Sequence, residues 1–222
     1  DMAAEVPQTP DACTKDGLDG LAFKSGCVTA ATSHLSLKPA EYAWLPLLAG
    51  NEGLKVIEVR FPKAGDLDAF VDIPNLESLT IYGAEIGDYS ALAKLQNLTL
   101  LAVNGSNLAD LEHVAAIRGL QKLQISKTAV SDLTDLAGHT SLQMLNIDNT
   151  SIVDLGPLSE IATLQSLSAN ETPVTDLSPL SGLPALRQLA LFRSQVEDLS
   201  PLKDMTGLNR LIVDSSRVSD LT

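Results

Sequence analysis

Leucine recurs at a fixed interval of 22 residues over most of this chain, with no insertion or deletion between copies. If each recurring leucine is position 0 of a repeat, positions 3, 5 and 10 are also apolar in every copy. A fixed period of this length is the signature of a solenoid, in which each repeat forms one coil. Position 0 is occupied by Leu54, Leu76, Leu98, Leu120, Leu142, Leu164, Leu186 and Leu208.

The spacing within each repeat predicts a strand followed by a short helical return. Positions 3 and 5 alternate with polar residues, which is the period of a strand with one buried face. Positions 13, 16 and 19 are apolar at intervals of three, which suits a 3₁₀ or irregular helical segment. A 22-residue coil cannot bury its own leucines, so it must stack on its neighbours. We therefore expect an α/β solenoid with a parallel β-sheet on its concave face and short 3₁₀ or irregular helical segments on its convex side.

The repeat L-x-x-L-x-L-x-x-[ST]-x-[VI]-x-D-L-x-P-L resembles the 22-residue leucine-rich repeat of the bacterial internalin type, over about residues 32–222. That family usually has asparagine at position 8, where its side chain ties adjacent coils together. This chain has serine or threonine there in six copies, and a hydroxyl offers fewer donors than an amide. We therefore expect a weaker ladder between its coils.

Composition divides the chain into two parts. Residues 1–31 begin polar and proline-bearing, and we interpret them as a cap over the first coil, because solenoids need a polar end. Residues 32–222 form the leucine-rich repeat domain, with a degenerate repeat from Thr32, full repeats from Leu54 and an incomplete last repeat from Leu208. No polar segment closes that last repeat, so we expect a continuation of the natural chain or a second copy of it to cover this end.

Both cysteines, Cys13 and Cys27, lie in the N-terminal segment. Two cysteines close together in a terminal cap predict a disulfide and an extracytoplasmic location: secreted, periplasmic or on the cell surface. Two free thiols in a cytosolic protein are the alternative. The chain begins with Asp1 rather than methionine, so we expect a processed or truncated N-terminus, and the lack of a recognisable signal peptide carries little weight.

Aspartate occupies position 12 in all eight copies, directly before the helical return. A carboxylate there can accept hydrogen bonds from the free N–H groups of the first turn, so we interpret the row as structural caps. The alternative is a ladder of metal sites, but no second acidic position recurs to complete an oxygen cage. The predicted caps are Asp66, Asp88, Asp110, Asp132, Asp154, Asp176, Asp198 and Asp220.

The sequence contains no catalytic or cofactor motif: no phosphate-binding loop, dinucleotide fingerprint, H-E-x-x-H, G-x-S-x-G or paired C-x-x-C. We therefore expect no enzyme activity, no cofactor and no metal. The formal net charge of −13 disfavours nucleic acid and anionic membranes as partners. No apolar run approaches the roughly 18 residues of a membrane span. His139 takes an otherwise apolar position 19, and we interpret it as a neutral core histidine bonded to a turn carbonyl, with a pH-sensitive element as the alternative.

The side chains most available to a partner are those that point outward from the strands, at positions 2, 4, 6 and 7. This face is close to neutral on an acidic protein, and it places aromatic residues beside arginines, which protein interfaces enrich. A merely solvated sheet is the alternative. Within this face the predicted partner-binding residues are Arg60, Phe61, Tyr82, Asn104, Gln124, Lys127, Asn146, Asp148, Asn170, Phe192, Arg193 and Arg210.

These observations favour a non-enzymatic module that holds a protein partner on its concave sheet. The resemblance to internalins implies an exported bacterial protein that contacts the cell envelope or a host cell. Two alternatives stay open. One is an intracellular regulatory scaffold, and the other is a fragment of a larger protein whose effector or enzymatic domain lies outside these residues.

Overall fold

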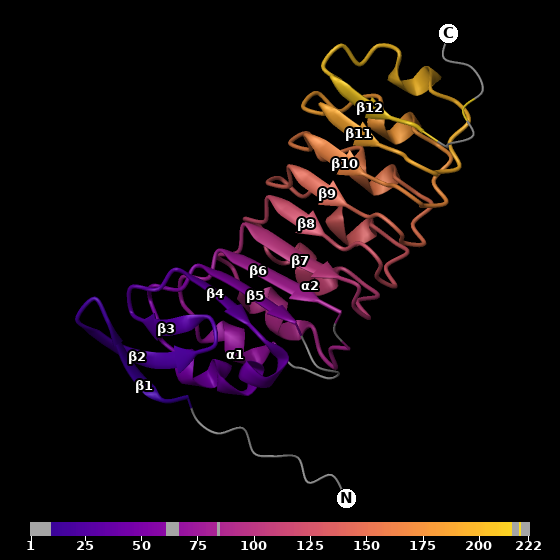
Figure 1. Cartoon of the computed structure of the whole chain (residues 1–222). Helices are drawn as coiled ribbons and strands as arrows, with labels where there is room; N and C mark the ends of the chain where they lie inside the picture. The colour runs from indigo at the N-terminus through magenta and orange to yellow at the C-terminus, as the bar shows by residue number, and fades with distance from the viewer. Residues whose placement is uncertain (1–9, 61–66, 84, 215–217, 219–222) are drawn as a thin grey trace, which may run out of the picture.

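The computed structural model describes residues 10–60, 67–83, 85–214 and 218, and shows an elongated solenoid (Figure 1). Its main sheet has nine parallel strands in sequence order, so each strand pairs only with the strands of adjacent coils. This confirms the predicted fold. The strands are β4 (His34–Leu37), β5 (Val56–Arg60), β6 (Ser78–Tyr82), β7 (Leu100–Asn104), β8 (Lys122–Gln124), β9 (Met144–Asn146), β10 (Ser166–Ser168), β11 (Gln188–Ala190) and β12 (Arg210–Ile212).

Each coil returns through a short helical segment on the side opposite the sheet (Figure 1). Three of the three-residue 3₁₀ segments carry a proline in their first two positions, where the missing N–H is not needed. These short returns agree with the apolar spacing of three. The segments are η1 (Pro39–Leu48), α1 (Asp68–Val71), η2 (Ser90–Lys94), α2 (Glu112–Ala115), η3 (Thr134–Leu136), η4 (Gly156–Leu158), η5 (Ser178–Leu180) and η6 (Ser200–Leu202).

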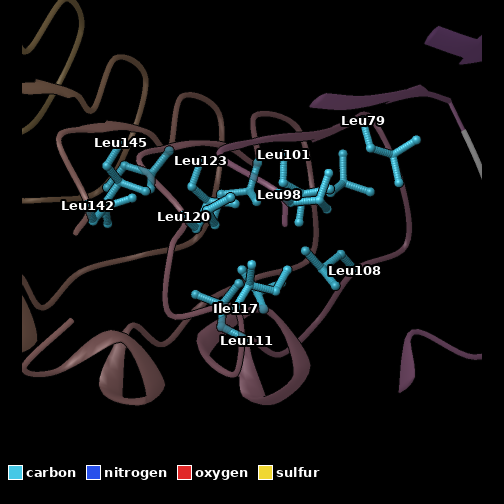
Figure 2. Packing of buried hydrophobic residues seen from close by; sticks show 14 of the residues in the cluster. Leu79, Leu98, Leu101, Leu108, Leu111, Ile117, Leu120, Leu123, Leu142 and Leu145 are labelled. Atoms are coloured by element: carbon cyan, nitrogen blue, oxygen red, sulfur yellow. The ribbon is translucent and has the colours of Figure 1, made fainter. Parts of the chain in front are cut away.

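A continuous apolar core lies between the sheet and the helical returns. Leu120 and Leu123 are fully buried on the strand side, and Leu111 and Ile117 face them from the helical side (Figure 2). The register of the sheet follows the 22-residue repeat, so equivalent leucines of successive coils stand side by side. Because each coil buries its leucines only against its neighbours, the stability of one coil depends on the next.

A separate antiparallel sheet of three strands precedes the parallel one and packs against its first coil (Figure 1). Phe23 and Val28 are buried in the same core as the repeats, and the Phe23 ring meets Trp44 edge-on at 5.5 Å between centroids. Cys13 and Cys27 form a disulfide between the outer strands, with Cα atoms 5.9 Å apart. The strands are β1 (Ala12–Lys15), β2 (Leu18–Phe23) and β3 (Gly26–Thr29).

Glu41 joins this small sheet to the first coil. Its side chain is fully buried, and its carboxylate accepts hydrogen bonds from the backbone N–H groups of Lys24 and Lys38. Lys24 lies in the turn between β2 and β3, whereas Lys38 directly precedes η1. These two bonds attach the hairpin turn of the small sheet to the first coil of the solenoid.

Five of the position-12 aspartates accept a hydrogen bond from the backbone N–H two residues ahead, at 2.7–2.8 Å. That N–H belongs to the first residue of the 3₁₀ segment, so the aspartate stands one residue before the formal cap position. Of the other described copies, Asp110 precedes α2 and shows no such bond; Asp66 and Asp220 lie outside the described residues. The five are Asp88, Asp132, Asp154, Asp176 and Asp198.

The position-8 hydroxyls bond within their own coil. In four copies the hydroxyl donates to the carbonyl oxygen three residues earlier, at 2.6–2.9 Å. The Ser194 hydroxyl is buried and has no hydrogen-bond partner among the described residues. In the four bonded copies, position 8 therefore closes the turn after its own strand. The four copies are Ser106, Thr128, Thr150 and Thr172.

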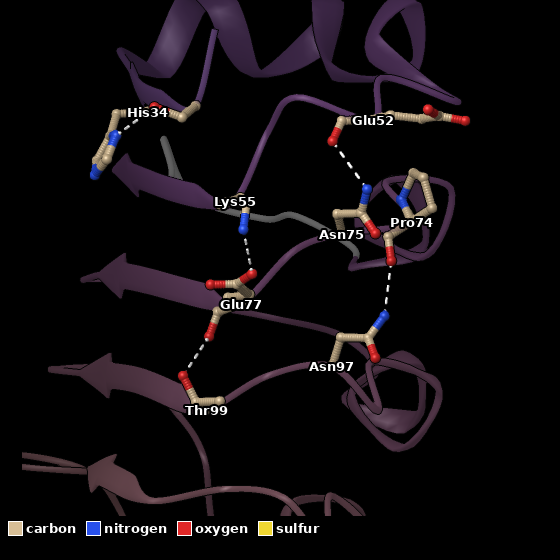
Figure 3. A network of polar contacts seen from close by, with 9 residues as sticks. His34, Glu52, Lys55, Pro74, Asn75, Glu77, Asn97 and Thr99 are labelled. Carbon is tan, nitrogen blue, oxygen red and sulfur yellow. Dashed lines mark hydrogen bonds and ion pairs between the residues drawn. The ribbon is translucent and has the colours of Figure 1, made fainter. Parts of the chain in front are cut away.

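Other side chains connect successive coils on the side where the chain enters the sheet (Figure 3). Asn75 donates to the Glu52 carbonyl at 2.9 Å, and Asn97 donates to the Pro74 carbonyl at 2.8 Å. Each bond spans 23 residues, which is one coil and one position. These amides tie adjacent coils together at the edge where the chain enters the sheet, as the family's asparagine does at position 8.

His139 lies in the core, 2% exposed. Its Nε2 is 3.2 Å from the Ile117 carbonyl oxygen of the preceding coil, and the Ser141 N–H donates to its Nδ1. This pattern requires a neutral ring with its proton on Nε2. Burial lowers the pKa of His139 below its usual 6.5, against the opposing effect of the bond to Ile117.

Candidate functional site

The concave face is built from alternate residues of the parallel strands. Positions 2, 4 and 6 line up across the sheet in three rows, because every strand pairs in the 22-residue register. The row at position 4 is shallow, since Thr80 and Ala102 are buried by their neighbours. Most of the exposed side chains of this face lie at positions 2 and 6 and at position 7, just beyond the strands. Together with position 4, these rows form the candidate binding surface.

Three of the predicted partner-binding residues use their side chains to hold the next coil. Asn104 Oδ1 accepts the Ser126 N–H at 3.0 Å, and an Asp148 oxygen accepts the Asn170 N–H at 2.8 Å. Asn170 Oδ1 in turn accepts the Phe192 N–H at 2.7 Å. All three acceptors occupy position 6 and are half-buried. The ladder that the family places at position 8 therefore occurs here two residues earlier.

Asn146 and Gln124, two further predicted binding residues from the central strands, also form hydrogen bonds with neighbours on the concave face. Asn146 Oδ1 accepts the Asp148 N–H at 2.9 Å, and Gln124 Oε1 accepts a long bond of 3.4 Å from Asn104. Ser168 donates to Asp148 at 2.7 Å. The middle of the concave sheet is thus a strip of amides, hydroxyls and one carboxylate that form hydrogen bonds with one another.

Two arginine–aromatic pairs lie toward opposite ends of the sheet. The Arg60 guanidinium lies over the Tyr82 ring, 5.3 Å from its centroid, on β5 and β6. The Arg193 guanidinium lies over the Phe192 ring at 4.9 Å, directly after β11. Arg193 also approaches Glu171 at 3.7 Å in an exposed ion pair. These pairs are six strands apart between β5 and β11, which is about 29 Å at the usual strand spacing.

Of the other predicted site residues, Lys127 and Arg210 are exposed at separate places on the sheet, and Phe61 lies outside the described residues. Met144, 41% exposed in the middle of the position-2 row, was not among the predicted binding residues. An apolar residue at an outward position is the signal that could have identified it.

Position 7 adopts a left-handed backbone in six successive coils, with φ between 52° and 66°. In the later copies the sequence signals this only at Asn149, because asparagine tolerates the conformation and glycine occurs only in the first two of these coils. The N–H of each position-7 residue donates to the position-6 carbonyl of the next coil, so the conformation serves the coil-to-coil ladder. The six residues are Gly83, Gly105, Lys127, Asn149, Glu171 and Arg193.

No group of three or more His, Cys, Asp or Glu side chains in the described part of the chain could hold a metal ion. Among the same residues, no helix has the length and apolar character needed to cross a membrane.

Comparisons with known proteins agree with the repeat architecture. A model of the family described as leucine-rich repeats (2 copies) matches residues 162–204, and a search of the curated proteins gives no match. An internalin of Listeria monocytogenes (inlF) is 26% identical with a TM-score of 0.71, and the match covers 86% of this chain and 55% of that one. This chain thus spans little more than half the length of that relative.

Two further solved structures share the fold. Internalin C2 (inlC2) of Listeria monocytogenes is 25% identical with a TM-score of 0.72, and the match covers 89% of this chain and 79% of that one. TLR13 in its complex with ssRNA13 is 17% identical with a TM-score of 0.67, covering 85% of this chain and 29% of that one. Together with the parallel sheet, its short 3₁₀ returns and the 22-residue register, these likenesses show that the chain has a leucine-rich repeat fold similar to that of the internalins.

Proposed function

We propose that this protein is a non-enzymatic module that holds a protein partner on its concave sheet. Leucine-rich repeat proteins generally mediate protein–protein interaction, and the observation that supports this use here is the pair of arginine–aromatic contacts. Arg60 with Tyr82, and Arg193 with Phe192, present the residue types that dominate binding energy in protein interfaces. The polar side chains between the two pairs already form hydrogen bonds with one another. We therefore expect these polar side chains to contribute little binding energy and mainly to set the distance between the two pairs.

The charge of the face favours a protein over a nucleic acid. Among its described residues, basic and acidic side chains are nearly balanced, although the whole chain carries −13. A phosphate backbone needs an excess of cations, whereas a protein surface of mixed charge does not. Because TLR13 is solved with ssRNA13, the fold alone does not exclude RNA, and the argument depends on this charge. The basic residues are Arg60, Lys122, Lys127, Arg193 and Arg210, and the acidic ones are Glu58, Asp148, Glu171 and Asp214.

We further propose that the protein is exported by a bacterium and acts at the cell envelope or on a host cell. The disulfide between Cys13 and Cys27 supports an oxidising compartment. The likeness to two internalins supports the bacterial part of the proposal. The three-stranded sheet, from Ala12 to Thr29, would then be a covalently closed cap ahead of the repeat domain.

Photocrosslinking from defined positions tests the concave site. A photoreactive p-benzoylphenylalanine replaces Tyr82 or Phe192 in two separate variants, and replaces Val153 in a third. Val153 is the matched control, because it is 55% exposed but lies at position 11, off the sheet. We expect both sheet variants to crosslink to one and the same protein, identified by mass spectrometry, and the control to leave it uncrosslinked.

The captured protein is then purified and its affinity measured by calorimetry. Phe192→Ala should weaken binding about 30-fold or more, as the loss of an interface anchor does. Crosslinking of equal efficiency from Val153, or an affinity unchanged by Phe192→Ala, would contradict the proposed site.

A further inference from the structure

Three apolar side chains point outward from the concave sheet at a regular interval. Val56, Leu100 and Met144 all occupy position 2, on β5, β7 and β9, so each is two coils from the next. Val56 and Leu100 are half-buried, and Met144 is 41% exposed. Single apolar residues on a surface are ordinary, but the core lies on the other side of the sheet and does not account for a regular row of them. These three residues are called the apolar row below.

The register of the sheet determines the spacing of the apolar row. Every strand from β5 to β9 pairs at position 2 with the same position of the next coil. Neighbouring strands lie about 4.8 Å apart, so successive members of the row are separated by roughly 9.6 Å. An α-helix places its residues i and i+7 on one side, about 10.5 Å apart. The difference adds to roughly 2 Å over the whole row, which the flexible Met144 side chain absorbs.

Two other backbone conformations were compared with this spacing. An extended strand does not fit, because its residues on one side recur at about 6.8 Å. A polyproline II segment repeats every three residues, at about 9.3 Å, and fits as well as an α-helix. Polyproline II segments dock in aromatic-lined grooves, whereas amphipathic α-helices lay an apolar face against aliphatic and methionine side chains. The apolar row consists of aliphatic residues and one methionine, so its chemistry favours the α-helix.

Lys122 adds a charge to the same row. It stands between Leu100 and Met144 at position 2, is exposed, and forms no ion pair with another described residue. On a helix that contacts Leu100 and Met144 through residues i and i+7, the residue that faces Lys122 is three or four positions from each of them, on the same side. A glutamate or aspartate at that position complements the lysine.

The neighbouring row leaves space for a helix. Position 4 of β6 and β7 is occupied by Thr80 and Ala102, whose short side chains are buried. A helix that runs across the strands therefore approaches the sheet closely between the apolar row and Tyr82, which is exposed at position 6. The apolar row borders the hydrogen-bonded polar strip and does not belong to it.

We propose that the concave sheet binds an amphipathic α-helix of the partner, which lies across strands β5 to β9. Apolar residues seven positions apart on this helix contact Val56, Leu100 and Met144, and a carboxylate between two of them pairs with Lys122. This proposal rests on the proposed function, because the helix belongs to the protein that is held on the same face. It adds the kind of structural element that the partner presents.

A synthetic peptide of about 18 residues, held helical by a hydrocarbon staple on its opposite side, tests the site. It carries leucine at its second, ninth and sixteenth residues and glutamate at its fifth and twelfth, so it presents the same pattern in either orientation. Fluorescence anisotropy measures its binding to the 222-residue chain at concentrations up to about 1 mM. We expect saturable binding, about tenfold tighter than that of a stapled peptide with the same composition in scrambled order.

Variants of the chain locate the bound peptide. Met144→Ala should weaken binding about tenfold, and Lys122→Glu should weaken it by a similar factor. A peptide with lysine in place of both glutamates should recover the lost affinity for Lys122→Glu. Val153→Ala and Lys94→Glu are the matched controls, because both residues are exposed and lie off the concave sheet, and they should change nothing.

The proposal would be overturned by the absence of saturable binding, by equal binding of the scrambled peptide, or by an affinity that Met144→Ala leaves unchanged. Tighter binding of a proline-rich peptide with leucine at every third residue would instead identify polyproline II as the bound conformation. The proposed function is tested separately, because crosslinking from Tyr82 and Phe192 captures a protein partner whatever its secondary structure. A partner captured there, together with a helical peptide that does not bind, would reject the helix and leave the concave site in place.

Discussion

Asn170 and Phe192 are joined across two coils by a 2.7 Å hydrogen bond, in which the Phe192 backbone N–H donates to Asn170 Oδ1. The short strands β10 and β11 end two residues before this point, so the sheet itself supplies no acceptor. The side chain at position 6 replaces the missing backbone partner. In this way a position-6 side chain on the concave face helps to hold adjacent coils together.

Asn170→Ala should therefore lower the free energy of unfolding by about 1–3 kcal/mol, because it leaves a half-buried N–H without an acceptor. Asn170→Asp keeps an acceptor oxygen in place, as Asp148 does in the preceding coil, so the free energy of unfolding should fall clearly less. Urea unfolding followed by circular dichroism measures both. Gln165→Ala, an exposed change on the same strand's entering side, should stay within about 0.5 kcal/mol. Equal losses for the alanine and aspartate variants would contradict the acceptor role.

The left-handed backbone at position 7 leads to a second prediction. Glu171→Gly should raise the free energy of unfolding by about 0.5–1 kcal/mol, since glycine avoids the steric cost that φ of 55° imposes on glutamate. Gly105→Ala should have the opposite effect, by about 1 kcal/mol. The atoms nearest to an added methyl group there are 3.9 Å away, so backbone strain alone would act. Thermal unfolding of the two variants decides this, and a loss of stability in Glu171→Gly would show that the glutamate side chain matters more than the strain.

Much of this architecture follows from the period of the sequence. The 22-residue interval, the period of two in the strand and the spacing of three in the return determine the sheet, its register and the core. The ladder at position 6 was not predicted, because a period of two treats Asn170 as outward and free. Its role depends on where the strand ends, which apolar spacing does not reveal. The left-handed conformation of Lys127 and Glu171 was missed because lysine and glutamate rarely adopt it, whereas glycine and asparagine are the residues that signal it in sequence.

The interpretation of the position-12 row as caps can be tested at Asp154, whose carboxylate accepts the Gly156 N–H at 2.7 Å. Asp154→Ala should cost about 0.5–2 kcal/mol of unfolding free energy, as lost caps do, and Asp154→Asn should recover most of it through its carbonyl oxygen. Adding EDTA to the original chain should leave the melting temperature unchanged. A fall with EDTA as large as that of the alanine variant would instead indicate metal sites along the row.

The last prediction concerns acid. Because burial lowers the pKa of His139 below 6.5, the unfolded chain binds a proton near pH 6 that the native core does not. The stability that depends on the neutral ring is complete above about pH 6.5, and it falls as the pH drops below that value. His139→Leu restores the apolar residue that most copies carry at position 19, so the loss of melting temperature between pH 7.5 and about pH 5 should become smaller.

Four aspartates provide an internal control for that experiment. The backbone and hydroxyl hydrogen bonds from the serine or threonine two residues ahead lower the pKa of Asp88, Asp132, Asp176 and Asp198 below 3.8. Their contribution is present above that value and is lost only as the pH falls below it, so it should decline equally in the original chain and in His139→Leu. An identical loss of melting temperature between pH 7.5 and about pH 5 in the variant and in the original chain would contradict a lowered pKa of His139 in the native core.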